Sequence, residues 1–95
     1  MLIPTAETAI AALHRDEVLD ADSLPLKYCA FTPCYRREAG SYRSHDRGTV
    51  RGHQFHKVEL FQYVAAPTSA AALDELVAAA EGLVQELKLH HRVSL

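Results

Sequence analysis

The sequence predicts an α+β protein: an antiparallel β-hairpin, or partial sheet, with one short and one long helix packed on one face. Two segments, 26–37 and 50–64, carry the alternating residue types of strands. The loop between them is too short for a parallel crossover connection, so the strands should be antiparallel. The segment 70–88 has apolar residues at helical spacing, which predicts the long helix.

Composition and charge narrow the class of protein. The chain has 95 residues, of which 48% are hydrophobic and 23% charged, as is typical of one small globular domain. The net charge of -2 gives no overall basic field for a nucleic-acid partner, although a local basic cluster lies between Arg36 and Arg51. No apolar run approaches the ~20 residues of a membrane span, and no N-terminal signal pattern is present. We therefore expect a cytoplasmic protein with no membrane partner.

The two cysteines, Cys29 and Cys34, are five residues apart in the first predicted strand. At ~3.3 Å per residue they are separated by about 16 Å and point to opposite faces. A disulfide needs Cα atoms within about 7 Å, so we expect both thiols to be reduced.

Local signals set the expected bounds of the remaining elements. Helical spacing predicts the short helix over 8–15, and Thr68 or Ser69 can cap the long helix. Pro33 lies inside the first strand and indicates an edge position or a bulge there. Residues 39–49 form the expected connecting loop, and the final HHRVSL has the pattern of a further strand.

The charged residues of the hairpin share one face. With a period of two, Arg36 and Glu38 lie on the same side of the first strand. The corresponding face of the second strand carries Arg51, His53, Phe55, Lys57, Glu59 and Phe61, while Val58 and Leu60 form an apolar face. Guanidinium groups can bind phosphate, a ring can stack on a base, and carboxylates can accept from an amine. Alternation alone leaves two interpretations open: a solvated surface, or a site for a nucleotide beside a small amino compound.

A zinc site is a different interpretation of the histidines, and we do not expect one. His53 and His56 are three apart in a strand and therefore face opposite sides, and the adjacent His90 and His91 also diverge. No cluster of cysteines accompanies them. We expect no metal ligands in this chain.

Three stretches resemble a known family. TAE at 5–7, TPCYRREAG at 32–40 and HQFHKVE at 53–59 resemble the seryl-tRNA synthetases, which are class II aminoacyl-tRNA synthetases. The run from Tyr35 to Glu38, a variable loop and then Phe55 match the pattern called motif 2. The resemblance covers nearly the whole chain. It implies that residues 1–95 are a partial class II catalytic domain containing motif 2.

The resemblance also implies roles for individual residues. Arg36 would contact the α-phosphate of ATP and the substrate carboxylate, which makes it the catalytic residue. Glu38 would accept from the adenine amino group, and Phe55 would stack on the adenine ring. The full implied ATP-binding set is Arg36, Arg37, Glu38, Arg51, Gly52 and Phe55. The implied serine-binding set is Thr5, Ala6, Glu7 and Glu59, with Lys57 as a structural or electrostatic neighbour.

The implied reaction joins serine to ATP to give seryl-adenylate and pyrophosphate, and then transfers serine to tRNA(Ser). ATP is a substrate, and Mg²⁺ accompanies it in the family through ligands that this chain does not carry. The family forms homodimers through motif 1, which is absent from this sequence, and motif 3 would lie beyond Leu95. We therefore expect weak or no activity from this chain alone.

Two other functions remain open. One is a related stand-alone ligase that activates an amino acid and loads it onto a carrier protein. The loop sequence SYRSHDRG, which differs from the family pattern, would fit that function. The other is a truncated, non-catalytic nucleotide-binding module.

Overall fold

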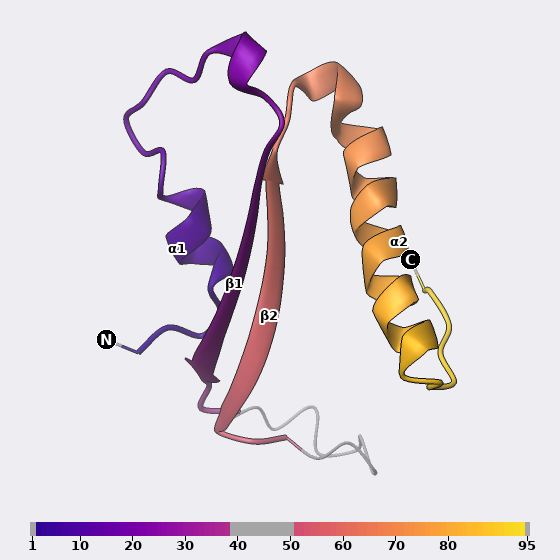
Figure 1. The fold of residues 1–95 in the computed structure, drawn as a ribbon. Coiled ribbons are helices and arrows are strands. Elements are labelled where there is room, and N and C mark those ends of the chain that lie inside the picture. Colours follow the sequence, from indigo (N-terminus) through magenta and orange to yellow (C-terminus); the bar gives the residue numbers. More distant parts are fainter. Residues whose placement is uncertain (1, 39–50, 95) are drawn as a thin grey trace. The chain divides into compact units, whose positions relative to one another are not determined.

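The computed structural model describes residues 2–38 and 51–94. Two strands form one sheet, accompanied by helices before and after it, and the α+β class is confirmed (Figure 1). The elements in chain order are α1 (Glu7–Ala11), the 3-10 turn η1 (Ala21–Ser23), β1 (Leu26–Tyr35), β2 (Gln54–Tyr63), the 3-10 turn η3 (Ala66–Thr68) and α2 (Ser69–Glu86). The predicted loop over 39–49 lies outside the described residues.

The chain divides into two compact units. The first comprises Met1–Leu19 and Lys27–Phe61, and the second comprises Asp20–Leu26 and Gln62–Leu95. The first unit holds α1 and nearly all of both strands, whereas the second holds α2 and both 3-10 turns. Every residue predicted for the site belongs to the first unit.

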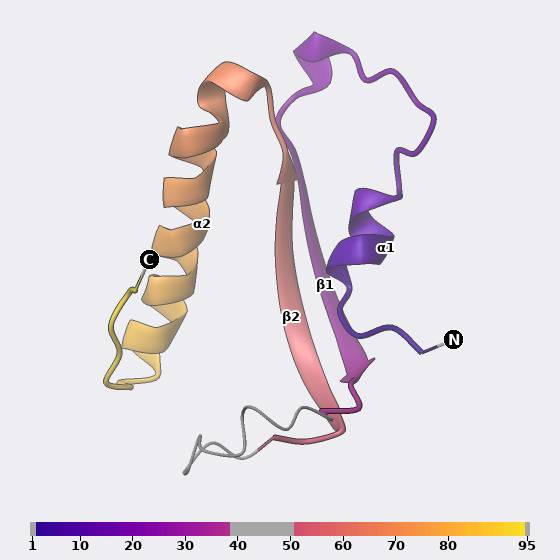
Figure 2. The same ribbon diagram turned by 180° about the vertical axis from the view of Figure 1, so that it is seen from behind.

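The hairpin of the first unit is antiparallel, with β1 and β2 side by side in both views (Figures 1 and 2). Beyond the strand ends, the backbone N–H of Arg36 donates to the carbonyl of His53 over 2.9 Å. One residue earlier, the N–H of Tyr35 points away from β2 and donates to the carbonyl of Ile3 over 3.0 Å. Pro33 has its nitrogen on the same side as Tyr35, so its missing N–H costs no bond to β2. The predicted edge position of Pro33 follows from this geometry.

The segment before α1 covers part of the charged face of the hairpin. Lys57 and Glu59 are half-buried on that face, whereas Val58 on the opposite face is 55% exposed. Lys57 and Glu59 thus lose part of their exposure to solvent. The reason is the path of the N-terminal segment, since Thr5 lies against Glu59.

The buried core of the first unit is small. Among the described residues, only Ala6, Ile10 and Cys34 are buried hydrophobic side chains. Ala6 precedes α1 and Ile10 lies within it, so the burial of α1 is what fills this core. Cys29 is exposed and, like Cys34, is a free thiol, as the strand geometry predicts.

The short elements end earlier than periodicity predicts. α1 covers Glu7–Ala11 instead of 8–15, and the turns that follow it end at Asp16, which has a left-handed φ of 63°. Leu13 is 55% exposed, so its apolar side chain is not buried as it would be in a longer amphipathic helix. β1 stops at Tyr35 and β2 begins at Gln54, so both strands are shorter at the loop end than expected.

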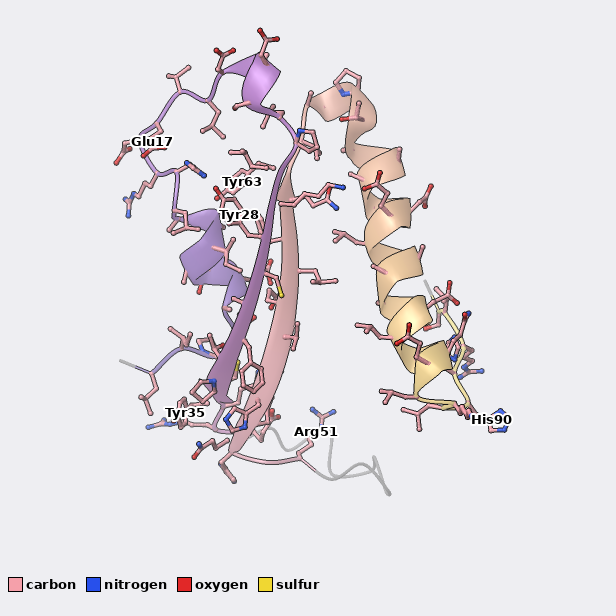
Figure 3. All side chains as sticks on the ribbon, viewed as in Figure 1. Glu17, Tyr28, Tyr35, Arg51, Tyr63 and His90 are labelled. Carbon is pink, nitrogen blue, oxygen red and sulfur yellow. The ribbon has the colours of Figure 1, made fainter. Side chains whose placement is uncertain are left out.

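A hydrogen-bonded chain ties the turn after α1 to the sheet. His14 Nδ1 lies 2.7 Å from a carboxylate oxygen of Glu17, and its Nε2 lies 2.6 Å from the hydroxyl of Tyr28 on β1. Tyr28 and Glu17 lie on the α1 side of β1 (Figure 3). The carboxylate orients the imidazole, which in turn fixes the tyrosine side chain. Sequence patterns gave no sign of this contact.

α2 confirms the predicted long helix within two residues at each end. No side chain caps its N-terminus; the hydroxyl of Thr68 donates instead to the carbonyl of Ala65. Leu73 and Leu83 of α2, and Leu87 directly after it, are exposed. No helix among the described residues is long and apolar enough to cross a membrane.

The C-terminal end of α2 explains why the predicted final strand is wrong. The N–H of Lys88 donates to Gln85 and that of Leu89 donates back to Val84, which is the pattern of a Schellman motif. Lys88 takes the left-handed conformation, with a φ of 55°. Residues 89–94 then continue without strand structure, because no neighbouring strand pairs with them in the described part of the chain.

Lys88→Gly is expected to stabilise the second unit by about 1 kcal/mol, because glycine avoids the left-handed penalty of an L residue. The measurement is the free energy of unfolding from denaturant titration followed by circular dichroism. Lys88→Ala is the matched control, since it removes the charge but keeps Cβ. Equal stability of the glycine and alanine variants would contradict the expectation.

Candidate functional site

The predicted site residues gather at the loop end of the hairpin and along the charged face of β2. Tyr35 and Arg51 mark the two sides of this end (Figure 3). The sequence places Arg36 and Glu38 just after β1, and Arg51 and Gly52 just before β2. The side chains form two clusters, one around Arg36 and one around Glu59.

Arg36 is held in place by three contacts. Its backbone N–H pairs with His53, its Nε donates to the carbonyl of Pro4 over 3.3 Å, and its guanidinium carbon lies 5.0 Å from the ring centroid of Phe55. That distance is within the range of cation–π attraction. A cation suited to phosphate and a ring suited to stacking are therefore neighbours before any ligand binds.

Glu38 and Arg51 form an ion pair at the loop end of the hairpin. Arg51 Nη1 lies 3.5 Å from Glu38 Oε2, and both side chains are partly exposed. Glu38 has a φ of 51°, so the expected alternation that put it on the same face as Arg36 does not continue through it. A left-handed glutamate is uncommon and costs about 1–3 kcal/mol, and such strain concentrates at functional sites.

The second cluster joins Thr5, Lys57 and Glu59. The Thr5 hydroxyl donates to Glu59 Oε2 over 2.8 Å, and Lys57 Nζ donates to the same hydroxyl over 3.0 Å. Lys57 Nζ also forms an ion pair of 2.5 Å with Glu59 Oε2. The hydrogen bond from Lys57, followed by that from Thr5, lowers the pKa of Glu59 below its usual value. Glu59 is thus a carboxylate that only accepts hydrogen bonds at neutral pH.

The remaining predicted residues differ in their surroundings. Ala6 is buried, with 1% of its surface exposed, so its side chain serves packing. Glu7 is exposed in the first turn of α1, and its backbone N–H donates to the Thr5 hydroxyl over 3.4 Å. Arg37 is exposed. A Cβ added to Gly52 would lie 3.0 Å from the carbonyl oxygen of Gln54, which explains a glycine at this close approach.

The two clusters lie on the same face of β2. Phe55, Lys57 and Glu59 are successive residues of that face, and each step of two residues advances about 7 Å along a strand. Sequence reasoning placed all three there but missed the contacts of Lys57 and the carbonyl of Pro4. The alternation of Phe55, Lys57 and Glu59 was the signal that could have assigned Lys57 to the cluster.

Among the described residues, no three histidine, cysteine, aspartate or glutamate side chains lie close enough together to hold a metal ion. A cavity of about 360 Å³ lies in the second unit, lined by residues of 21–25, 62–68 and 71–75. No predicted site residue lines this cavity.

Comparison with known proteins identifies the class. The whole chain, residues 1–95, matches the family described as the tRNA synthetase class II core domain (G, H, P, S and T). The chain belongs to this family.

Within the family, the similarity is to seryl-tRNA synthetases. The chain is 60% identical over 93 residues to serine–tRNA ligase 2 of Clostridium acetobutylicum, covering 98% of this chain and 22% of that protein. It is 56% identical over 91 residues to serine–tRNA ligase of Synechococcus elongatus, covering 96% of this chain and 21% of that protein. These matches confirm the resemblance found in the sequence motifs.

A solved structure agrees. The seryl-tRNA synthetase of Pyrococcus horikoshii, crystallised with ATP, superposes with a TM-score of 0.81 and 45% identity. The match covers 90% of this chain and 19% of that one. This chain therefore spans about a fifth of the length of the relatives it matches.

The ionised Glu59 predicts a dependence of stability on pH. Because the pKa of Glu59 is lowered in the folded chain, its contacts stabilise the fold above the usual glutamate pKa of about 4.3. That contribution is lost as pH falls through the lower, folded-state pKa. We expect wild type to be more stable than Glu59→Gln at about pH 7, with the difference shrinking as the pH is lowered through this folded-state pKa.

The measurement is the free energy of unfolding of both chains across this pH range. Glu86→Gln, at an exposed position of α2, is the matched substitution away from the cluster. A difference between wild type and Glu59→Gln that stays constant with pH would contradict the assignment.

Proposed function

We propose that this chain supplies the ATP- and serine-binding part of a seryl-tRNA synthetase catalytic domain. The observation that carries the proposal is the pairing of Arg36 with Phe55 on the same face as the Thr5–Lys57–Glu59 cluster. A phosphate-binding cation and a stacking ring thus lie beside a carboxylate that can receive an amine or hydroxyl. The similarity to serine–tRNA ligases supports the choice of serine as the amino acid.

In this proposal ATP binds at the loop end of the hairpin. The adenine ring stacks on Phe55, and its amino group donates to Glu38. Arg36 turns its guanidinium toward the α-phosphate, so that it exchanges the contact with the Phe55 ring for a charge-assisted bond. Arg51, Arg37 and the backbone near Gly52 complete the nucleotide site. The ion pair between Glu38 and Arg51 is partly exposed, and replacing such a pair costs about 0–1 kcal/mol.

Serine binds in the proposal next to the second cluster. Glu59 accepts from the substrate, with Thr5, Ala6 and Glu7 forming the neighbouring wall. The serine carboxylate then lies toward Arg36, which neutralises its charge. This arrangement holds the nucleophile and the α-phosphate together, and such positioning accounts for much of the rate enhancement in bimolecular reactions.

The proposed reaction is an in-line displacement at phosphorus. A serine carboxylate oxygen forms a bond to the α-phosphorus while the bond to the bridging oxygen breaks, and pyrophosphate leaves with that electron pair. Negative charge builds on the α-phosphate oxygens, where a fixed guanidinium stabilises it. No side-chain nucleophile takes part. In the second step a hydroxyl of the terminal ribose of tRNA(Ser) attacks the carbonyl carbon of seryl-adenylate, the bond from that carbon to the phosphate oxygen breaks, and AMP leaves with the electron pair.

Mg²⁺ would screen the phosphate charges of bound ATP in the complete enzyme. The described residues offer it no converging carboxylates, because Glu38 is paired with Arg51 and Glu59 with Lys57. We assign none of these described side chains to the metal.

Arg36→Ala tests the nucleotide site. Hydrogen bonds to charged groups are worth about 1.5–3 kcal/mol, so we expect ATP to bind about 10- to 100-fold more weakly. Isothermal titration of this chain with ATP and with a nonhydrolysable seryl-adenylate analogue measures the effect. Arg15→Ala, an exposed arginine of the first unit, is the control and should leave both affinities unchanged. Unchanged ATP binding in Arg36→Ala would refute the proposed site.

Phe55→Leu tests the stacking of the base. Stacking on an aromatic ring is worth about 1–3 kcal/mol per base, so we expect roughly 5- to 100-fold weaker ATP binding. Phe31→Leu is a matched control, because Phe31 is 69% exposed on the opposite face of the hairpin, against His56. Equal effects of the two substitutions would count against a specific adenine contact at Phe55.

A further inference from the structure

In the polar cluster around Glu59, the side chain of Lys57 contacts two other side chains at once. Lys57 lies two residues before Glu59 on the same face of β2, while Thr5 comes from a segment 52 residues away from Lys57. All three pairs are in contact: Lys57 with Thr5, Thr5 with Glu59, and Lys57 with Glu59. Lys57 thus adds a second contact, besides that of Glu59, between β2 and the hydroxyl of Thr5.

The hydroxyl of Thr5 has no hydrogen-bonding capacity left over. A hydroxyl has one donor and two acceptor lone pairs. In the described structure it donates to Glu59, accepts from Lys57 Nζ, and accepts from the backbone N–H of Glu7 at 3.4 Å. A ligand could bind this hydroxyl only by displacing one of these partners.

The carboxylate of Glu59, by contrast, makes its contacts in this cluster through only one of its two oxygens. Both the bond from Thr5 and the ion pair with Lys57 end on Oε2. Oε1 receives no hydrogen bond from the described side chains in this cluster. Because Lys57 and Thr5 fix one oxygen, the orientation of the other is fixed as well.

We propose that Lys57 is a positioning residue of the serine site: it anchors Oε2 of Glu59 and the hydroxyl of Thr5, so that Oε1 is the acceptor presented to the substrate. This inference rests on the proposed function. Lys57 need not touch serine, and its effect reaches the substrate through Glu59.

The arrangement has a consequence for specificity. When the serine hydroxyl donates to Oε1 this oxygen is satisfied, whereas an analogue without that hydroxyl, such as alanine, leaves an ionised carboxylate oxygen unpaired. Sites built to bind a substrate hydroxyl reject analogues lacking it for this reason. If Lys57 is removed, Glu59 loses its fixed orientation and its ionised form is less favoured, so discrimination should fall more than general affinity.

The test compares Lys57→Met, which keeps the length of the side chain without its charge, with Lys57→Arg, which keeps the charge. Isothermal titration gives the affinities for ATP and for nonhydrolysable seryl- and alanyl-adenylate analogues. We expect Lys57→Met to reduce the seryl-to-alanyl preference about tenfold, as loss of a hydrogen bond to a charged group would. ATP affinity should stay within about twofold, and Lys57→Arg should recover part of the preference.

Two further variants sharpen the test. Lys88→Met is the matched control, since it makes the same chemical change in the second unit and should alter none of these values. Thr5→Val removes the other anchor of Glu59 and should lower the preference in the same direction. It provides a second arm if Lys57→Met does not fold.

A readout without ligand separates this inference from the proposed function. Carbon-13 NMR titration of the Glu59 carboxylate should show a higher pKa in Lys57→Met than in wild type. An unchanged Glu59 titration, an unchanged seryl-to-alanyl preference, or an equal loss of ATP affinity in Lys57→Met would each overturn the inference. If wild type binds none of the three ligands, the proposed function fails, and the NMR titration alone decides whether Lys57 holds Glu59.

Discussion

The contact of Thr5 with Glu59 and Lys57 is the constraint on which the first unit depends. It holds the N-terminal segment across the charged face of the hairpin, a face that would otherwise be open to water. Once Thr5 is in place, the carbonyl of Pro4 reaches Arg36, and Ala6 is carried into the small core. A polar cluster thus organises both the packing of α1 and the geometry of the site.

The site is ordered by contacts that a ligand can exchange at low cost. Arg36 lies over Phe55 and Glu38 lies beside Arg51, so these charged groups have partners in the absence of a ligand. Each pair is partly exposed, where ion pairs contribute little to stability. Glu38 also has a left-handed backbone conformation, which is a source of local strain. Side chains that are already ordered by such contacts lose less conformational entropy when they exchange one partner for another.

Family membership and physical chemistry address different parts of the function. Membership in the class II core family and similarity to serine–tRNA ligases define the lineage, for a chain that spans about a fifth of those relatives. The contacts of this chain indicate which oxygen of Glu59 is available and which group fixes it. The position of the Glu59 carboxylate in this chain therefore depends on Lys57 and Thr5.

The sequence by itself determined the hairpin, the long α2 helix and the grouping of Phe55, Lys57 and Glu59 on one face. These are local properties, because the period of a strand or helix reports the backbone of neighbouring residues. Only the tertiary structure decided that this charged face is covered, that Glu38 leaves the alternation, and that no strand follows α2. Thr5 and Glu59 are 54 residues apart in the chain, and no periodic pattern carries information about a contact over that separation.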